Sequence, residues 1–349
     1  MGLNVITQER RIVTSRLATR VLLAGPDDGV PVVFVHGNLS AATWWEEAML
    51  RLPPGFRAIA PDLRGYAGAD PAALIDARRG MGDFVDDLAA LFDALGIAAA
   101  HCVGHSLGGG ILWQFLADHP GRVLSLVQVA PASPFGFGGC HADGRPCFAD
   151  GAGSGGGAVN PDFARLLAEG ARGDETPSHP RAILNTYVWK PPFVPGRIED
   201  ILSSALAQHQ GPQAYPGDAR TSENWPGVAA GDFGPVNALA PIYQADPLAF
   251  TRIAVKPPVL WLRGADDPVV ADASLFDLGT LGSLGAVPGW PGAEVFPPQP
   301  MIAQTESALA AYAAGGGEVT RLVLPDCGHS PYLEQPGAFD AALHRHLGV

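Results

Sequence analysis

Positive charge is scarce in this chain of 349 residues, and long apolar runs are absent. Lys and Arg number 22 against 35 Asp and Glu, which gives a formal net charge of −13. This acidity argues against a nucleic-acid-binding surface or a polybasic membrane anchor. No uninterrupted apolar stretch approaches the length of a membrane span, and residues 1–20 carry scattered charges without the apolar core of a secretion signal. We therefore expect a cytoplasmic protein with no nucleic-acid or membrane partner.

Cysteine is also rare, with four residues in the whole chain. Cys102 and Cys327 are expected to be buried thiols. Cys140 and Cys147 could close a small loop as a disulfide, but a reducing compartment favours free thiols. His141 and Asp143 lie between them, yet this spacing fits no zinc pattern. We expect no metal and no cofactor.

Apolar residues, by contrast, make up 47% of the chain, enough for a substantial core. The length suits one large α/β domain with an insertion, or two ordinary domains. Strands are predicted within 5–24 and at 30–35, 56–60, 123–129, 258–263 and 319–324, and helices at 81–95, after Ser106, at 301–314 and at 338–347. This alternation predicts an α/β fold with a doubly wound, mostly parallel sheet.

The alternation is interrupted after the sixth strand. Residues 132–250 contain a glycine-rich stretch, short helical pieces and aromatic loop residues, which we interpret as an inserted cap between core segments 1–131 and 251–349. A second interruption, 271–300, is rich in Gly and Pro and is expected to be an ordered loop excursion rather than a helix. Its role, and whether the protein is a homodimer, stay open.

The most informative stretch is Gly104-His105-Ser106-Leu107-Gly108, a G-x-S-x-G pattern between a strand and a helix. Small residues on both sides of the serine allow strand and helix to approach through a sharp, strained turn. The hydroxyl then stands clear of the sheet, and the helix that follows offers unpaired backbone N–H groups to a developing negative charge. Ser106 is therefore predicted to be a nucleophile.

Two further motifs follow strands in the order acid, then histidine. Gly264-Ala265-Asp266-Asp267 follows one strand, and Gly328-His329-Ser330-Pro331 follows the last. With these residues the chain resembles a serine hydrolase, esterase-like, of the α/β-hydrolase fold, over residues 20–131 and 255–349. The resemblance implies Ser106 as nucleophile, His329 as general base and Asp267, ahead of Asp266, as the acid that orients the histidine.

The resemblance also implies an oxyanion hole made of the backbone N–H groups of Leu107 and Asn38. Trp44, His105 and Trp189 are candidates for substrate contact. The alternative for His105, as for His36, is to brace the loop, and for the tryptophans it is core packing.

The function implied is hydrolysis of a carboxylic ester or lactone of a mainly apolar small molecule through an acyl-enzyme. Amide, thioester and carbon–carbon bond hydrolysis use the same triad and stay open, as do lyase and acyltransferase reactions. Dehalogenases and epoxide hydrolases of this fold use an aspartate nucleophile. A serine at position 106 argues against both of these enzyme classes. A non-catalytic ligand-binding protein of the same fold is the alternative from a different class.

Overall fold

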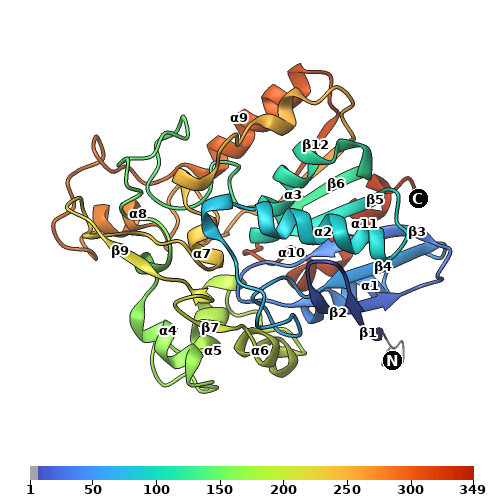
Figure 1. The fold of residues 1–349 in the computed structure, drawn as a ribbon, viewed down its shortest axis with the longest axis horizontal. Coiled ribbons are helices and arrows are strands. Elements are labelled where there is room, and N and C mark those ends of the chain that lie inside the picture. The colour runs from blue at the N-terminus through green and yellow to red at the C-terminus, as the bar shows by residue number, and fades with distance from the viewer. Residues whose placement is uncertain (1–6) are drawn as a thin grey trace.

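The computed structural model describes residues 7–349 and is built on one eight-stranded sheet (Figure 1). Its strands are β1 (Gln8–Val13), β2 (Ala18–Ala24), β3 (Val30–Val35), β4 (Phe56–Pro61), β5 (Ala100–His105), β6 (Val123–Val129), β11 (Val259–Gly264) and β12 (Val319–Leu324). Their order is β1-β2-β4-β3-β5-β6-β11-β12; the strands from β4 to β12 are parallel, and β2 pairs antiparallel with both β1 and β4. The predicted mostly parallel sheet is confirmed; Val5, which belonged to the predicted strand region, lies outside the described residues.

Helices cover both faces of the sheet, as its alternating apolar side chains require. Val33 and Val35 face a cluster with α2 (Gly82–Ala94), α3 (Leu107–Asp118) and α9 (Met301–Ala314). Val32 and Phe34 face the opposite cluster, with α1 (Glu46–Leu50), α10 (Pro331–Glu334) and α11 (Pro336–His346). Short 3₁₀ segments η1 (Ala42–Trp45), η2 (Ala77–Arg79) and η3 (Pro120–Arg122) connect these elements. The result is a three-layer α/β/α core.

The segment between β6 and β11 lies largely to one side of the sheet, at the lower left of Figure 1. It contains η4 (Gly156–Ala158), α4 (Pro161–Ala168), α5 (Pro180–Ile183), η5 (Leu184–Val188), α6 (Ile198–Leu206), β7 (Gln210–Gly211), β8 (Tyr215–Pro216), β9 (Ala219–Thr221), β10 (Val228–Ala230), α7 (Pro235–Ala238), η6 (Pro241–Tyr243) and η7 (Ala249–Arg252). Leu184, Trp189, Ile201 and Leu202 belong to the same apolar cluster as α1 and α11. This part of the cap segment therefore shares the core of the sheet.

The 271–300 excursion is ordered, but the expectation that it lacks a helix is wrong at α8 (Leu278–Ser283). The Asp277 carboxylate accepts the Thr280 N–H and so starts this helix despite its glycines. The excursion packs on the 132–250 segment: the Phe296 ring lies 4.8 Å from that of Trp225, and a Cβ on Gly153 would lie 2.3 Å from Phe296. The glycine-rich stretch thus admits the excursion's aromatic side chain.

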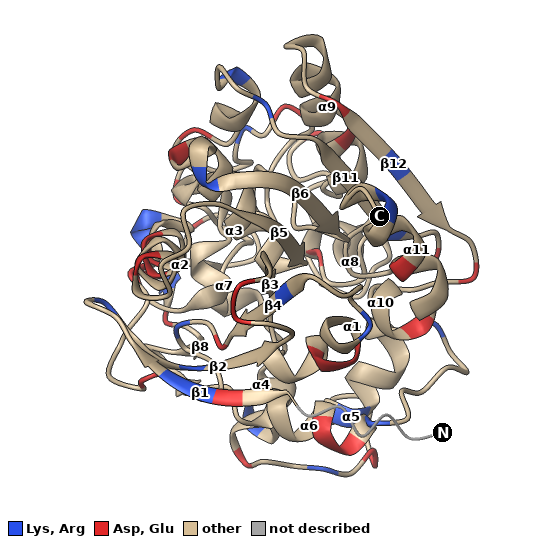
Figure 2. Cartoon of the chain, turned by 90° about the vertical axis from the view of Figure 1, so that its right-hand side faces the viewer, with Lys and Arg blue, Asp and Glu red and all other residues tan. Residues whose placement is uncertain are grey.

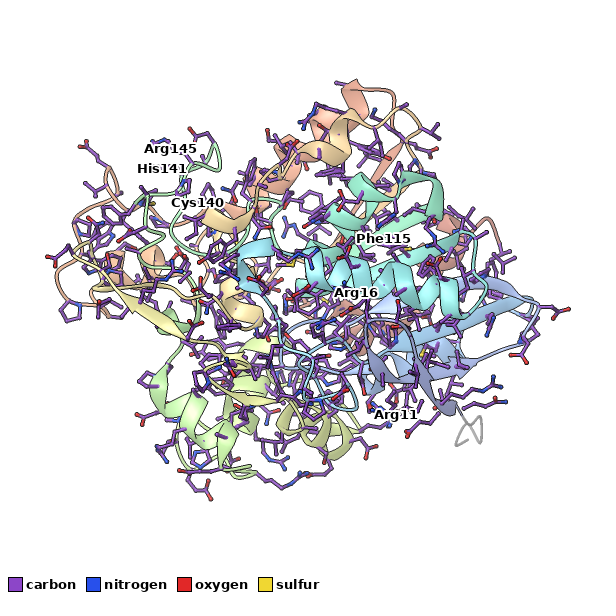
Figure 3. The ribbon with its side chains drawn as sticks, viewed as in Figure 1. Arg11, Arg16, Phe115, Cys140, His141 and Arg145 are labelled. Atoms are coloured by element: carbon purple, nitrogen blue, oxygen red, sulfur yellow. The ribbon has the colours of Figure 1, made fainter. Side chains whose placement is uncertain are left out.

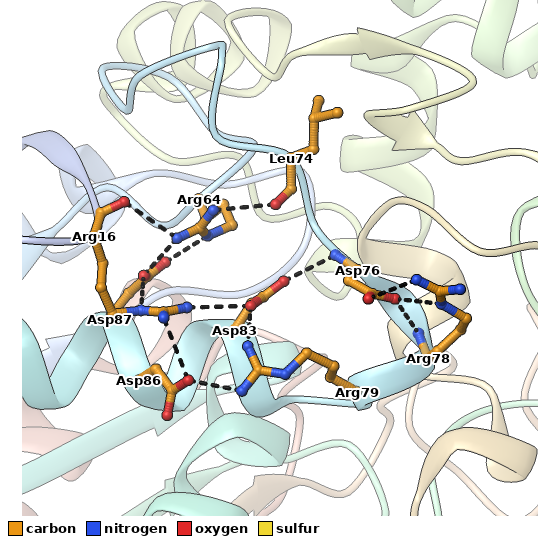
Figure 4. Close-up of polar contacts among 9 residues, drawn as sticks. All are labelled: Arg16, Arg64, Leu74, Asp76, Arg78, Arg79, Asp83, Asp86 and Asp87. Atoms are coloured by element: carbon orange, nitrogen blue, oxygen red, sulfur yellow. Dashed lines mark hydrogen bonds and ion pairs between the residues drawn. The ribbon is translucent and has the colours of Figure 1, made fainter.

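Basic and acidic positions, blue and red in Figure 2, are interspersed along the ribbon. The densest ionic network lies where α2 meets the loop after β4 (Figure 4). Arg64 donates from Nε and Nη2 to the two carboxylate oxygens of Asp87, at 2.7 and 2.6 Å. Its Nη1 donates to the Leu74 carbonyl oxygen at 3.1 Å. Arg16 also donates to Asp87, at 3.0 Å. This network fastens the loop after β4 to α2.

Replacing Arg64 by Met is expected to lower the free energy of unfolding by about 2 kcal/mol, because Asp87 stays buried with Arg16 as its remaining partner. The side chains of Arg64 and Asp87 are 9% and 8% exposed, so little water replaces the lost bonds. Urea denaturation measures the change. Arg78→Met, which removes an exposed pair with Asp76, is the matched control and is expected to leave stability unchanged. Equal effects of the two variants would contradict this account.

Candidate active site

The Ser106 turn has the strained geometry that its glycines predict. Ser106 joins β5 to α3 with φ 55° and ψ −118°, a left-handed conformation that is costly for a residue with a side chain. A Cβ on Gly104 would lie 2.7 Å from the Gly108 carbonyl oxygen, and one on Gly108 would lie 2.2 Å from that of Val35. Only glycine fits at these two positions, so strand, turn and helix can pack closely while Ser106 remains half-buried.

His329 lies in the loop after β12 and is oriented by a carboxylate. Its Nδ1–H donates to Asp267 Oδ2 over 2.8 Å, and Asp267 Oδ1 accepts the N–H groups of Val269 and Val270 at 2.8 and 3.1 Å. The His329 and Asp267 side chains are 5% and 2% exposed. Both carboxylate oxygens are therefore engaged, and the imidazole is held with Nε2 free.

Asp266, the reserve candidate for the acid, points elsewhere. Its side chain is 45% exposed and accepts the Lys190 ammonium at 2.8 Å. The structure thus brings Asp267, and not Asp266, to His329. Because β11 and β12 are parallel neighbours, their carboxyl ends place the two loops side by side.

The histidine loop is also attached to the nucleophile turn. His105, the residue before Ser106, donates from Nε2 to the His329 carbonyl oxygen at 2.9 Å, and the two rings lie 4.7 Å apart. Burial, with a smaller effect of His329, lowers the pKa of His105 well below its ordinary value, so this ring stays neutral. Among residues 7–349 no hydrogen bond joins Ser106 Oγ to His329; in unliganded sites this contact is often long.

The predicted oxyanion loop, 36–38, runs against the serine. A Cβ on Gly37 would lie 3.0 Å from Ser106 Cβ. His36 fixes the loop: Nδ1–H donates to the Gly37 carbonyl at 2.8 Å, and Nε2 accepts the Leu63 N–H at 3.0 Å. Burial lowers the pKa of His36 to about 4, so its ring remains neutral and Nε2 can accept. His36 is thus a brace.

The Asn38 side chain also helps to hold the predicted oxyanion loop in place. Its Oδ1 accepts the Tyr66 hydroxyl at 2.8 Å and the Gln208 amide of the cap at 3.3 Å. The backbone N–H of Leu107 opens the first turn of α3, where helical N–H groups lack intrahelical acceptors. The loop that carries Tyr66 also carries Arg64, which binds Asp87 of α2. The ionic network of Figure 4 therefore holds the Tyr66 loop, and through Tyr66 it supports the predicted oxyanion loop.

The three residues predicted to touch substrate are packed inside the protein. Trp44 and His105 are each 2% exposed and Trp189 is fully buried. Trp44 Nε1 donates to Ser204 Oγ of α6 at 2.9 Å, and its ring lies 6.4 Å from that of Trp189. These contacts favour the alternatives of bracing and core packing, and substrate contact stays a prediction for the three.

Sequence reasoning did not single out Glu334, Lys190, Tyr66 or Gln208, although each contacts a loop of the site. For Glu334 a signal existed, because Ser330-Pro331 followed by an acidic residue in the first turn resembles a helix start. The other three contacts join distant parts of the chain and leave no local pattern.

All four cysteines are free thiols in the structure. Cys140, His141 and Arg145 lie on one loop at the upper left of Figure 3, away from Phe115 of α3. No group of three or more His, Cys, Asp or Glu that could hold a metal is found within residues 7–349. In the same part of the chain, no helix is long and apolar enough to cross a membrane.

Comparison with known proteins agrees with this fold. A profile of the alpha/beta hydrolase fold family matches residues 30–143, which include the predicted oxyanion loop and nucleophile turn. A serine hydrolase structure from Cycloclasticus zankles superposes over 98% of both chains with a TM-score of 0.63 and 17% sequence identity, which shows the shared fold. This chain has the α/β-hydrolase fold, and residues 30–143 match the family of that name.

Two curated relatives match part of the chain. A non-heme chloroperoxidase from Streptomyces lividans is 42% identical over 113 residues, 32% of this chain and 40% of the relative. The carboxylesterase YbfK from Bacillus subtilis is 32% identical over 132 residues, 37% of this chain and 44% of the relative. The aligned segments thus span less than half the length of these relatives.

Proposed function

We propose that this protein hydrolyses carboxylic esters through an acyl-enzyme formed on Ser106. The observation that carries the proposal is a strained serine turn beside a buried His329–Asp267 pair. His329 Nε2 takes the Ser106 proton while Oγ attacks the ester carbonyl carbon. The oxyanion that forms is stabilised by the N–H groups of Leu107 and Asn38.

The same groups complete the reaction. The imidazolium returns its proton to the leaving alcohol as the tetrahedral intermediate collapses, which leaves the acyl group on Ser106 Oγ. His329 then takes a proton from water, whose oxygen attacks the acyl carbon. The second tetrahedral intermediate releases the acid and returns the proton to Ser106. Asp267 holds the imidazole tautomer throughout and stabilises its protonated form.

An apolar substrate is supported by the side chains above the oxyanion loop. Leu39, directly after Asn38, packs with a cluster of cap residues built on Phe163, Leu167 and Tyr215. Part of a substrate that extends from the scissile carbonyl toward the cap would therefore meet apolar surface. The carboxylesterase relative supports ester as the bond class.

Initial rates on p-nitrophenyl esters from acetate to laurate test this proposal. We expect saturable turnover with an optimum above acetate, because longer acyl chains bury more apolar surface, at about 0.8 kcal/mol per CH₂. A falling rate from acetate onward would contradict an apolar acyl site. Absence of turnover on every ester, with tight binding of an apolar ligand, would favour the non-catalytic alternative.

A further inference from the structure

The carboxylate of Glu334, on α10, collects backbone N–H groups from both sides of His329. Oε2 accepts the Gly328 N–H at 2.8 Å, and Oε1 accepts the Ser330 N–H at 3.1 Å. Because Gly328 and Ser330 are the chain neighbours of His329, one carboxylate fixes the peptide units that carry the imidazole. Hydrogen bonds to an ionised acceptor are stronger than neutral ones, which suits a role in holding a loop.

The third N–H on this carboxylate comes from the cap. Lys190, which follows η5, donates its backbone N–H to Glu334 Oε2 at 2.8 Å. The approach is close, because a Cβ on Gly328 would lie 2.7 Å from the Lys190 nitrogen and 2.9 Å from the Trp189 carbonyl carbon. Glycine at 328 thus allows the cap backbone to lie directly on the histidine loop.

The Lys190 side chain joins the same cap segment to the acid loop. Its Nζ donates to Asp266 Oδ2 at 2.8 Å and to Asp326 Oδ1 at 2.9 Å. Asp266 precedes Asp267 in the chain, and Asp326 opens the turn that leads to His329. One cap residue therefore contacts both loops whose side chains form the Asp267–His329 hydrogen bond.

The adjoining cap residues anchor this contact. Trp189 is fully buried, and it shares an apolar cluster with Trp44 and with α11 of the core. Lifting this segment would expose Trp189 and break the Lys190 N–H contact, one of the three that the Glu334 carboxylate accepts. The segment 189–190 is therefore anchored to the core through the Trp189 side chain.

We infer that Glu334 and Lys190 are positioning residues that hold the Asp267–His329 pair in register, so that the cap at 189–190 is part of the catalytic scaffold rather than a lid. This inference rests on the proposed function for its kinetic consequence. Misplacing a catalytic group by about 1 Å costs about 10²-fold in rate. The loss falls on kcat, because neither side chain is placed in contact with substrate.

Three variants with one matched control test the inference in the full-length protein. Glu334→Ala is expected to lower kcat about 30-fold with KM changed less than about 2-fold. Glu334→Gln, which keeps one acceptor oxygen, is expected to lose about 5-fold, and Lys190→Met, which keeps the backbone N–H, about 3-fold. Glu306→Gln removes an exposed carboxylate that pairs with Arg321 on the far side of β12 and is expected to behave as wild type.

A spectroscopic measurement separates this inference from the proposed function. The proton between His329 Nδ1 and Asp267 is expected to give a low-field ¹H NMR resonance in the wild type, whatever ester is turned over. It should shift or broaden in Glu334→Ala and Lys190→Met and be unchanged in Glu306→Gln. An unchanged resonance in folded Glu334→Ala would overturn the inference; if that variant does not fold, an unchanged resonance and kcat in Lys190→Met would do so.

Discussion

Ser106→Ala is expected to lower kcat/KM for p-nitrophenyl ester hydrolysis by at least about 10³-fold, the scale for removing a triad nucleophile. The variant loses the attacking oxygen and keeps the Asp267–His329 hydrogen bond. Its fold should be retained, because alanine is no larger than serine at the strained φ of 55°. Initial rates over a range of substrate concentrations, with thermal unfolding as a check of the fold, measure this effect.

The matched control for this variant is Ser125→Ala. Ser125 is a buried serine of β6 that hydrogen-bonds His101 of β5, near the amino ends of those strands and away from the site. Its removal should change stability more than activity, with kcat/KM within about 3-fold of wild type. A folded Ser106→Ala protein that retained more than a tenth of wild-type activity would exclude Ser106 as the nucleophile.

The two neighbouring aspartates give the second large effect. Asp267→Asn is expected to lower kcat about 10³- to 10⁴-fold, while Asp266→Asn lowers it less than about 3-fold. The asparagine oxygen would continue to accept the Val269 and Val270 N–H groups, so its NH₂ would face His329 Nδ1 and stabilise the wrong tautomer. The histidine could then no longer take a proton from serine.

This pair of substitutions is its own control, since each removes one negative charge at adjacent positions. Asp266 is exposed and bound to Lys190, so its loss should act only through the loop. Steady-state kinetics on one ester, with both variants shown to be folded, distinguish the two. Equal losses, or a larger loss for Asp266→Asn, would contradict the assignment of the acid.

Much of the core was predictable because it follows regular periodicities. The helix 301–314 and the strand 319–324 were predicted at the bounds the structure gives, and the alternation of strand and helix predicted the parallel sheet. The 132–250 segment was predictable only as an interruption of this alternation. Its elements are two to nine residues long and are held by contacts with distant segments, as α6 is by the hydrogen bond from Trp44 Nε1 to Ser204 Oγ. Such elements leave weak local patterns.

The residues of the candidate site also fall into those that the sequence could predict and those that it could not. Ser106, Asp267 and His329 each follow a strand in a short motif, so their convergence could be predicted from the chain order. The role of Glu334 could not be predicted in this way, because a helix-start pattern gives its place in the chain but not the three backbone N–H groups that its carboxylate accepts. Trp44 and Trp189 show a related limit: proximity to the site was predictable, but the direction of each ring depends on α6 and the cap.

The most direct test of the account is the mass of the protein after reaction with a fluorophosphonate, which captures an activated serine as a stable covalent adduct. We expect one adduct per chain, located by peptide mapping at Ser106, and none in Ser106→Ala. Asp267→Asn should react far more slowly than Asp266→Asn, because the histidine must take the serine proton. An unmodified wild-type protein, or an adduct at another residue, would contradict a serine hydrolase mechanism at this site.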